Sequence, residues 1–272
     1  MMDVLHQKKA ELEKCLSESG SVAVAFSSGV DSTFLLKVAH DVLGDKAVAV
    51  TALPRSFPQR ERQEAAAFCE KEGIRQLVVE VDELTIPGFC ENPPNRCYLC
   101  KRALFTEMIR AAAACGTATV AEGSNADDAG DYRPGLQAIA ELKVKSPLRE
   151  VGLTKVEIRA LSKELGLPTW EKPSYACLST RFVYGETITA EKLRMVETAE
   201  QLLFDRGFRQ VRVRLHGELA RIEVEPEELE RIVQPELRAA LNARLQQLGF
   251  RYVTLDLGGY AMGSMNKGIK NR

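Results

Sequence analysis

The sequence predicts an α/β protein, in which helices cover both faces of a mostly parallel sheet and a small α+β domain follows. Two observations carry this prediction. In the first part of the chain, short apolar runs alternate with helical segments, an order typical of parallel sheets. After Gly185 the order changes to α-β-β-α-β. We therefore expect a first domain over residues 1–185 and a second domain over residues 186–272.

Each predicted strand of the first domain is a short apolar run, and segments with helical periodicity separate these runs. The strands are expected at 22–26, 47–51, 76–81 and 117–122, and the helices at 33–43, 59–72 and 96–115. Thr154 and Glu157 form a capping box that begins a helix to Leu165. In the second domain we expect helix 190–206, strands 210–216, 219–225 and 252–257, and a helical stretch over 226–248 interrupted near Pro235.

Composition excludes several classes of protein. The chain has 37 Lys and Arg against 38 Asp and Glu, which argues against a protein held to nucleic acid by bulk charge. Its beginning lacks the apolar stretch of a signal peptide, and no apolar run approaches the roughly 18 residues of a membrane helix. Seven cysteines without an export signal indicate a reducing cytoplasm, where thiols pack, bind metals or react rather than form disulfides.

The turn after the first strand has the composition of an anion site. It reads Ser27-Ser28-Gly29-Val30-Asp31-Ser32-Thr33 and lies between a predicted strand and a helix, where free N–H groups and the helix dipole bind phosphate. An aspartate beside an anion suggests a metal ion carried by the phosphate. Neither a Walker loop nor a dinucleotide fingerprint is present. A serine-rich turn that only caps the helix is the alternative.

Three thiols form a second candidate site. Cys97 and Cys100 are one turn apart near the start of a predicted helix, with Asn95 as N-cap, and that position favours the thiolate. A structural zinc site would need a second pair, which is missing, and Cys177 is the remaining candidate. Three cysteine ligands suit a [4Fe–4S] cluster with one open iron. Thiol redox chemistry and unrelated half-buried cysteines remain open. We interpret the other cysteines as packing or loop residues: Cys15, Cys69, Cys90 and Cys115.

The turn resembles the S-G-G-x-D-S pyrophosphate loop of the N-type ATP pyrophosphatases, the PP-loop superfamily, with Ser28 in place of the first glycine. The segment AEGSNADD at 121–128 resembles their acidic loop near magnesium. Over nearly its whole length, the chain resembles the LarE family of ATP-dependent sulfur transferases, which make the nickel-pincer nucleotide of lactate racemase. Ala261 departs from that pattern, where we expect a larger polar residue. The segments that match this family, besides the turn, are 92–101, 125–135, 173–181 and 252–266, and segments 146–148 and 155–165 resemble the common core of the PP-loop superfamily.

This resemblance implies a Rossmann-like parallel sheet and an adenylating enzyme. Members activate a carboxylate of pyridinium-3,5-biscarboxylic acid mononucleotide with ATP and Mg²⁺, release pyrophosphate and insert sulfur to give the thiocarboxylate. Cys97, Cys100 and Cys177 place the chain with members that hold a [4Fe–4S] cluster, whose extra sulfide would be the donor. Sacrifice of the Cys177 sulfur is the fallback. We also expect ATP and the pyridinium nucleotide as binding partners, no membrane or nucleic acid partner, a homo-oligomer and a cytoplasmic location.

The resemblance also implies roles for individual residues. Pyrophosphate and its magnesium would be held by Ser27, Gly29, Asp31 and Ser32. Asp127 or Asp128 would complete the metal shell, with helix capping and loop hydrogen bonding as the alternative. Arg212 and Arg214 lie on one face of a strand and would bind the substrate phosphate, unless they pair with Glu223 or Glu225 across the sheet. Arg133 and Arg181 are expected to contact a phosphate group. Glu200 is expected either near the sulfur donor or on a solvated helix face.

Two alternatives remain at this point. A tRNA thiolase shares the pyrophosphate loop, but such enzymes usually carry a basic RNA-binding surface that this composition does not indicate. A nucleotide-binding module without turnover would need the loop but neither the three thiols nor the arginine pair. An amidotransferase is less favoured, since no glutaminase domain is evident.

Overall fold

The structure is a computed structural model that describes residues 3–130, 134–261 and 263–264. The chain divides into two compact units, Met1–Glu83 with Cys97–Tyr175, and Leu84–Arg96 with Ala176–Arg272. The boundary between two domains that the sequence predicts near residue 185 stays a prediction.

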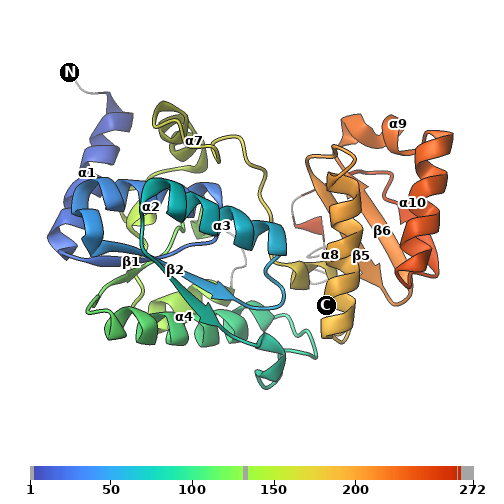
Figure 1. Cartoon of the computed structure of the whole chain (residues 1–272), viewed down its shortest axis with the longest axis horizontal. Coiled ribbons are helices and arrows are strands. Elements are labelled where there is room, and N and C mark those ends of the chain that lie inside the picture. Colours follow the sequence, from blue (N-terminus) through green and yellow to red (C-terminus); the bar gives the residue numbers. More distant parts are fainter. Residues whose placement is uncertain (1–2, 131–133, 262, 265–272) are drawn as a thin grey trace. The chain divides into compact units, whose positions relative to one another are not determined.

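A four-stranded parallel sheet forms the centre of the first unit, with the order β3-β2-β1-β4 (Figure 1). Its strands are β1 Val22–Ala25, β2 Ala47–Leu53, β3 Gln76–Glu80 and β4 Val120–Ala121. Each pairing is parallel. The α/β class predicted from the alternating apolar runs is therefore confirmed, and β1, which precedes the serine-rich turn, is a central strand.

Helices lie on both faces of this sheet. In Figure 1, α2 and α3 lie on one face and α4 on the other. The capping box that begins α7 is present, because Thr154 and Glu157 exchange their hydrogen bonds. Helices α1 and α5 were not among the predicted elements. The helices are α1 Val4–Ser19, α2 Val30–Leu43, α3 Gln59–Glu72, α4 Arg96–Ala114, α5 Pro134–Glu141, α6 Pro147–Glu150 and α7 Lys155–Glu164, with short turns η1 Gly44–Lys46, η2 Glu83–Thr85 and η3 Ala126–Gly130.

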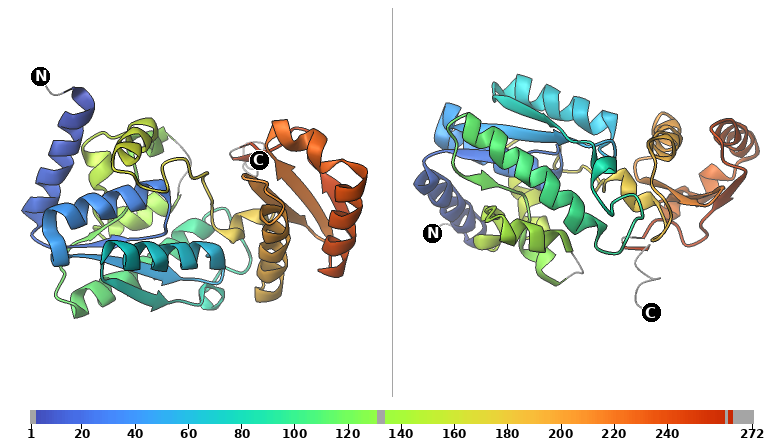
Figure 2. Two further views of the ribbon diagram at one scale, coloured as in Figure 1. Left: turned by 45° about the horizontal axis from the view of Figure 1, so that its top comes forward. Right: turned by 90° about the horizontal axis from the view of Figure 1, so that it is seen from below.

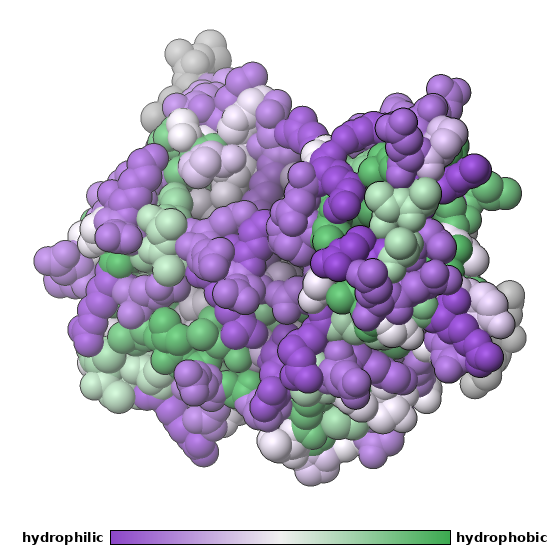
Figure 3. Space-filling model, turned by 45° about the vertical axis from the view of Figure 1, so that its right-hand side comes forward, coloured by the Kyte–Doolittle hydropathy of each residue, from purple (hydrophilic) through white to green (hydrophobic). Residues whose placement is uncertain are grey.

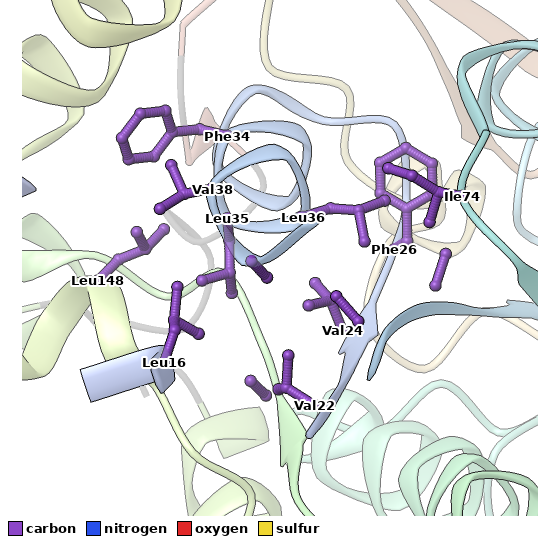
Figure 4. Packing of buried hydrophobic residues seen from close by; sticks show 14 of the residues in the cluster. Leu16, Val22, Val24, Phe26, Phe34, Leu35, Leu36, Val38, Ile74 and Leu148 are labelled. Carbon is purple, nitrogen blue, oxygen red and sulfur yellow. The ribbon is translucent and has the colours of Figure 1, made fainter. Parts of the chain in front are cut away.

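The core follows from the alternation of side chains along β1. Val22, Val24 and Phe26 point to one face and pack with α1, α2 and α3, as Figure 4 shows around α2. Ala23 points to the other face, where it joins the core beneath α4, which includes Phe105. Burial on both faces holds the strand, so the turn after β1 begins from a rigid element.

The second unit is built on a three-stranded mixed sheet, with the order β5-β6-β7 (Figure 2). Strands β5 Val211–His216 and β6 Leu219–Val224 are antiparallel, and β7 Tyr252–Leu255 runs parallel to β6. The predicted α-β-β-α-β order is confirmed, with the helical stretch before β7 broken at Pro235. The remaining elements are η4 Leu178–Arg181, α8 Ala190–Phe204, η5 Pro226–Glu228, α9 Leu229–Ile232 and α10 Pro235–Gln247.

The segment Leu84–Arg96 belongs to the second unit by its contacts, although it comes early in the sequence. The Asn92 side chain donates to the Val183 carbonyl at 2.7 Å, and the Gly185 N–H donates to the Asn92 carbonyl at 3.0 Å. These pairings are far apart in sequence, which is why the sequence pattern did not indicate them.

The face drawn in Figure 3 is mostly hydrophilic, in keeping with the 28% of charged residues. Among the residues that the structure describes, no helix combines the length and the apolar character needed to cross a membrane.

Candidate active site

The serine-rich turn leads from β1 directly into α2. Gly29 is the N-cap of α2, in extended conformation, and Asp31 lies in the first turn of the helix. The hydroxyls of Ser27 and Ser32 lie 3.3 Å apart, and Ser32 also donates to the Gly29 carbonyl at 3.2 Å. Hydroxyl groups and the N-terminus of a long helix thus meet at the carboxyl end of a central strand, which is where phosphate groups bind in such folds.

Ser28 adopts the left-handed conformation that the glycine of the pattern would adopt. Its φ is +52°, a value that costs a residue with a Cβ about 1–2 kcal/mol. The side chain is 2% exposed, and its hydroxyl donates toward the Glu61 carbonyl at 3.1 Å and the Glu61 carboxylate at 3.2 Å. The departure from the glycine pattern is therefore compensated by contacts with α3.

The acidic loop after β4 packs against this turn. A side chain at Gly123 would bring its Cβ to 3.0 Å from the Ser32 nitrogen and 3.2 Å from the Asp31 Cβ, so only glycine fits without movement. The Asp31 carboxylate accepts hydrogen bonds from Lys155 Nζ at 2.5 Å and from the Asn125 amide at 3.4 Å. Asp31 and the acidic loop thus lie next to each other within the first unit.

Two aspartates of this loop make backbone hydrogen bonds. Asp127 accepts from the Lys155 N–H at 2.8 Å, at the first residue of α7, and Asp128 accepts from the Asn125 N–H at 3.0 Å. These hydrogen bonds are the helix-capping and loop contacts that were the alternative to magnesium binding. Asp128 is buried and Asp127 is exposed. Coordination of magnesium by either residue stays a prediction.

The three thiols come from both units. Cys97 and Cys100 lie one turn apart on α4 in the first unit and are half-buried, whereas Cys177 precedes η4 in the second unit and is exposed. None of these three cysteines takes part in a disulfide. Within the part of the chain that the structure describes, no three His, Cys, Asp or Glu side chains are grouped to bind a metal ion. Thiolates are the ligands that an iron–sulfur cluster takes, and the cluster remains a prediction.

A buried group of charges surrounds β5. Arg214 pairs with Glu223 on β6 through N–O distances of 3.1 and 2.9 Å, and Ser264 donates to the same carboxylate at 3.0 Å. The guanidinium of Arg212 lies 5.1 Å from the centre of the Tyr260 ring. The cross-strand pairing considered for these arginines is therefore present for Arg214.

Arg181 and Glu200 form the second ion pair of this group. Arg181, which is 1% exposed, donates through Nε and Nη2 to the two carboxylate oxygens of Glu200, both at 2.8 Å. Glu200 also accepts from the Val213 N–H at 2.9 Å. The alternative that Glu200 lies on a solvated helix face is wrong, because this carboxylate is buried against β5.

Burial and neighbouring charge shift the pKa values here. Burial alone would raise the pKa of Glu200, yet the charge and hydrogen bonds of Arg181 hold that pKa below its usual value. Burial, together with the charge of Arg181, lowers the pKa of Arg212 to about 10. Three buried guanidinium groups face two buried carboxylates, a net charge of +1 by 3 − 2. Such a site can take up an anion such as a phosphate group.

Comparisons with known proteins show the family to which the chain belongs. A profile of the NAD synthase family matches residues 4–90. The chain is 45% identical to an uncharacterized protein of Synechocystis sp., over 97% of this chain and 98% of that protein. It is 40% identical to the pyridinium-3,5-bisthiocarboxylic acid mononucleotide synthase of Lactiplantibacillus plantarum, over 97% of this chain and 96% of that enzyme. The chain therefore belongs to the LarE family.

As a LarE-family protein, the chain is a PP-loop ATP pyrophosphatase homologous to LarE sulfur transferases. A weaker likeness, 27% identity over 73% of this chain, links it to the GMP synthase (glutamine-hydrolyzing) of Phaeosphaeria nodorum, covering 42% of that protein. Turn 27–33 lies within the matched profile, and its role as the pyrophosphate loop stays a prediction.

Some residues of this LarE-family site were not predicted from the sequence. Lys155, Lys172, Tyr260 and Ser264 contact the predicted residues, but their own sequence neighbourhoods carry no signal for such contacts. Ala261 is exposed. Arg133 lies outside the described residues, so its predicted phosphate contact stays a prediction.

Proposed function

We propose that this chain adenylates pyridinium-3,5-biscarboxylic acid mononucleotide and replaces a carboxylate oxygen with sulfur, as a step of nickel-pincer nucleotide synthesis. The observation that carries the proposal is the 40% identity to a pyridinium-3,5-bisthiocarboxylic acid mononucleotide synthase over 96% of its length. The serine-rich turn between β1 and α2 supports it as well, because its hydroxyls and the N-terminus of α2 suit the binding of a phosphate group.

The activation step follows from the pyrophosphate loop. A carboxylate oxygen of the substrate attacks the α-phosphorus of ATP, the bond to the β-phosphate oxygen breaks, and pyrophosphate leaves. We assign Ser27, Gly29 and Ser32 to the pyrophosphate. Asp31 would bind magnesium, with Asp127 or Asp128 completing its shell, and the acidic loop packed against Asp31 supports this assignment. Lys155 neutralises the Asp31 carboxylate in the structure, so metal binding would displace the lysine.

The transfer step needs a sulfur nucleophile. Sulfide attacks the adenylated carbon, AMP leaves, and a thiocarboxylate remains. We assign Cys97, Cys100 and Cys177 as ligands of a [4Fe–4S] cluster, which would supply the sulfide when bound. The accessibility of these cysteines and the lack of a disulfide at any of the three support the assignment. Direct attack by the Cys177 thiolate, followed by loss of its sulfur, is the fallback.

The buried charges around β5 would hold the phosphate of the pyridinium nucleotide. Arg212 is the strongest candidate, because a phosphate would relieve the cost of its burial beside Arg181. Arg214 and Arg181 form ion pairs with Glu223 and Glu200. We propose that they orient the site and contact the phosphate only if those ion pairs rearrange.

The test of the function offers ATP, magnesium and a sulfide source with either the pyridinium dicarboxylate nucleotide or unmodified tRNA. We expect pyrophosphate and a sulfur-labelled nucleotide in the first mixture only. Label that appears only in tRNA would replace this function with that of a tRNA thiolase. Pyrophosphate from neither mixture would contradict both.

The sulfur source is tested separately. After anaerobic reconstitution with iron and sulfide, we expect an iron–sulfur absorption band that disappears when Cys97, Cys100 and Cys177 are all replaced by alanine. A band that survives this triple substitution would contradict the ligand assignment. Mass spectrometry after turnover distinguishes the fallback, because a sacrificed Cys177 loses about one H₂S.

A further inference from the structure

The conformation of the pyrophosphate loop depends on residues outside it. Ser28 is the only non-glycine residue of the turn with a positive φ, and its hydroxyl forms hydrogen bonds with Glu61 and Lys172, which lie outside the turn. A serine without support would relax toward negative φ and change the course of the chain between β1 and α2. The residues that hold Ser28 therefore hold the loop.

Lys172 makes the central contacts with Ser28. Its ammonium group donates to the Ser28 carbonyl at 2.9 Å, to the Glu61 carboxylate at 2.7 Å and to the Glu64 carboxylate at 2.5 Å. These contacts account for the three N–H donors of a lysine. The side chain of Lys172 is only 10% exposed. A charged group this buried is expected to be committed to its partners.

The segment that carries Lys172 is itself attached to α3. The guanidinium of Arg60 lies 4.5 Å from the centre of the Tyr175 ring, and Glu61 and Glu64 both come from the first turns of the same helix. Because Glu61 also accepts the Ser28 hydroxyl, the three side chains form a closed network. Contacts of Ser28 with both α3 and Lys172 over-determine its left-handed conformation.

We propose that Lys172 and Glu61 are positioning residues that clamp Ser28 in its left-handed conformation and so preorganise the loop for ATP. The inference rests on the proposed binding of ATP by this loop. It extends that proposal because neither residue belongs to the loop or contacts the groups assigned to the phosphates. Glycine adopts positive φ without support, so the clamp is needed only because position 28 is serine.

The experiment tests whether the effect of Lys172 on ATP binding depends on the serine at position 28. The dissociation constant of ATP with magnesium is measured by calorimetry for the wild type, Ser28→Gly, Lys172→Met and the double variant. We expect Lys172→Met to weaken ATP binding about tenfold, equivalent to ~1.4 kcal/mol. In the Ser28→Gly background, the same substitution should weaken binding by less than about threefold, since glycine holds the conformation unaided. Lys163→Met is the matched control, because Lys163 stacks on Trp170 instead, and its affinity should equal that of the wild type.

A merely structural role of Lys172 predicts a different result. Equal weakening in both backgrounds, no weakening by Lys172→Met, or loss of ATP binding by Ser28→Gly alone would overturn the proposal. If melting curves show that Lys172→Met does not fold, Glu61→Gln is added to remove the buried charge, and the same comparison is made with and without Ser28→Gly. A wild type that does not bind ATP would refute the loop's role and this inference with it, whereas failed sulfur transfer with intact ATP binding would refute only the proposed function.

Discussion

Replacing Glu200 by glutamine should strongly destabilise the second unit. Glutamine keeps the shape of the side chain and an acceptor for the Val213 N–H, but it removes the charge that Arg181 faces at 2.8 Å. The buried charge of the group then rises from 3 − 2 to 3 − 1. Breaking a buried ion pair from one side costs ~3–5 kcal/mol, and the retained hydrogen bond places Glu200→Gln near ~3 kcal/mol.

Hydrogen exchange of the β5 amides measures this loss where it occurs. A loss of ~3 kcal/mol corresponds to exchange about 10²-fold faster when exchange reports the opening equilibrium. Glu230→Gln is the matched control, an exposed glutamate of α9 whose substitution should change stability by no more than ~0.5 kcal/mol. Adding Arg181→Met to Glu200→Gln should recover part of the loss, because it removes the cation that Glu200→Gln leaves without its carboxylate.

The same ion pair makes stability depend on pH. The pKa of Glu200 is lower in the folded protein than its ordinary value of 4.5, so the carboxylate adds stability above that value, which is lost as pH falls through the folded pKa. The free energy of unfolding of the wild type should therefore fall below pH 4.5 more steeply than that of Glu200→Gln. Wild-type exchange rates in Glu200→Gln, or a double variant no more protected than the single one, would refute the buried ion pair as the source of stability.

The remaining predictions concern the anion site, the metal site and the thiols. Arg212→Met should raise the melting temperature, since it removes a buried cation whose pKa burial lowers to about 10. We expect inorganic phosphate to raise the melting temperature of the wild type but not that of Arg212→Met; an equal rise in both would contradict the assignment. Asp31→Asn should lower the rate of pyrophosphate release by about 10²-fold or more if Asp31 holds magnesium, and an unchanged rate at saturating magnesium would exclude that role. Burial raises the pKa of Cys69 to about 12, so at pH 8 iodoacetamide should modify the exposed Cys177 within minutes and leave Cys69 unmodified; equal rates measured by mass spectrometry would show that Cys69 is accessible.

The sequence around Glu200 contains a signal that this side chain is buried. The buried residues Leu193, Val196 and Leu203 of α8 recur at helical spacing, and Glu200 falls on the same stripe. A glutamate inside an apolar stripe indicates a buried partner, although the pattern does not say which cation supplies it. Arg181, which is 19 residues away in sequence, was identifiable only from the fold.

The sequence by itself determined the parallel sheet, the helices that connect its strands and the serine-rich turn, because apolar periodicity, capping residues and a serine-glycine turn act over a few neighbouring residues. The tertiary structure alone decided how Ser28 keeps a conformation that suits glycine, since its partners Glu61 and Lys172 lie 33 and 144 residues away. The same holds for Arg214, whose preference for Glu223 depends on the register of β5 and β6. Buried charges interact through space in a medium of low dielectric constant, and only the folded chain brings them together.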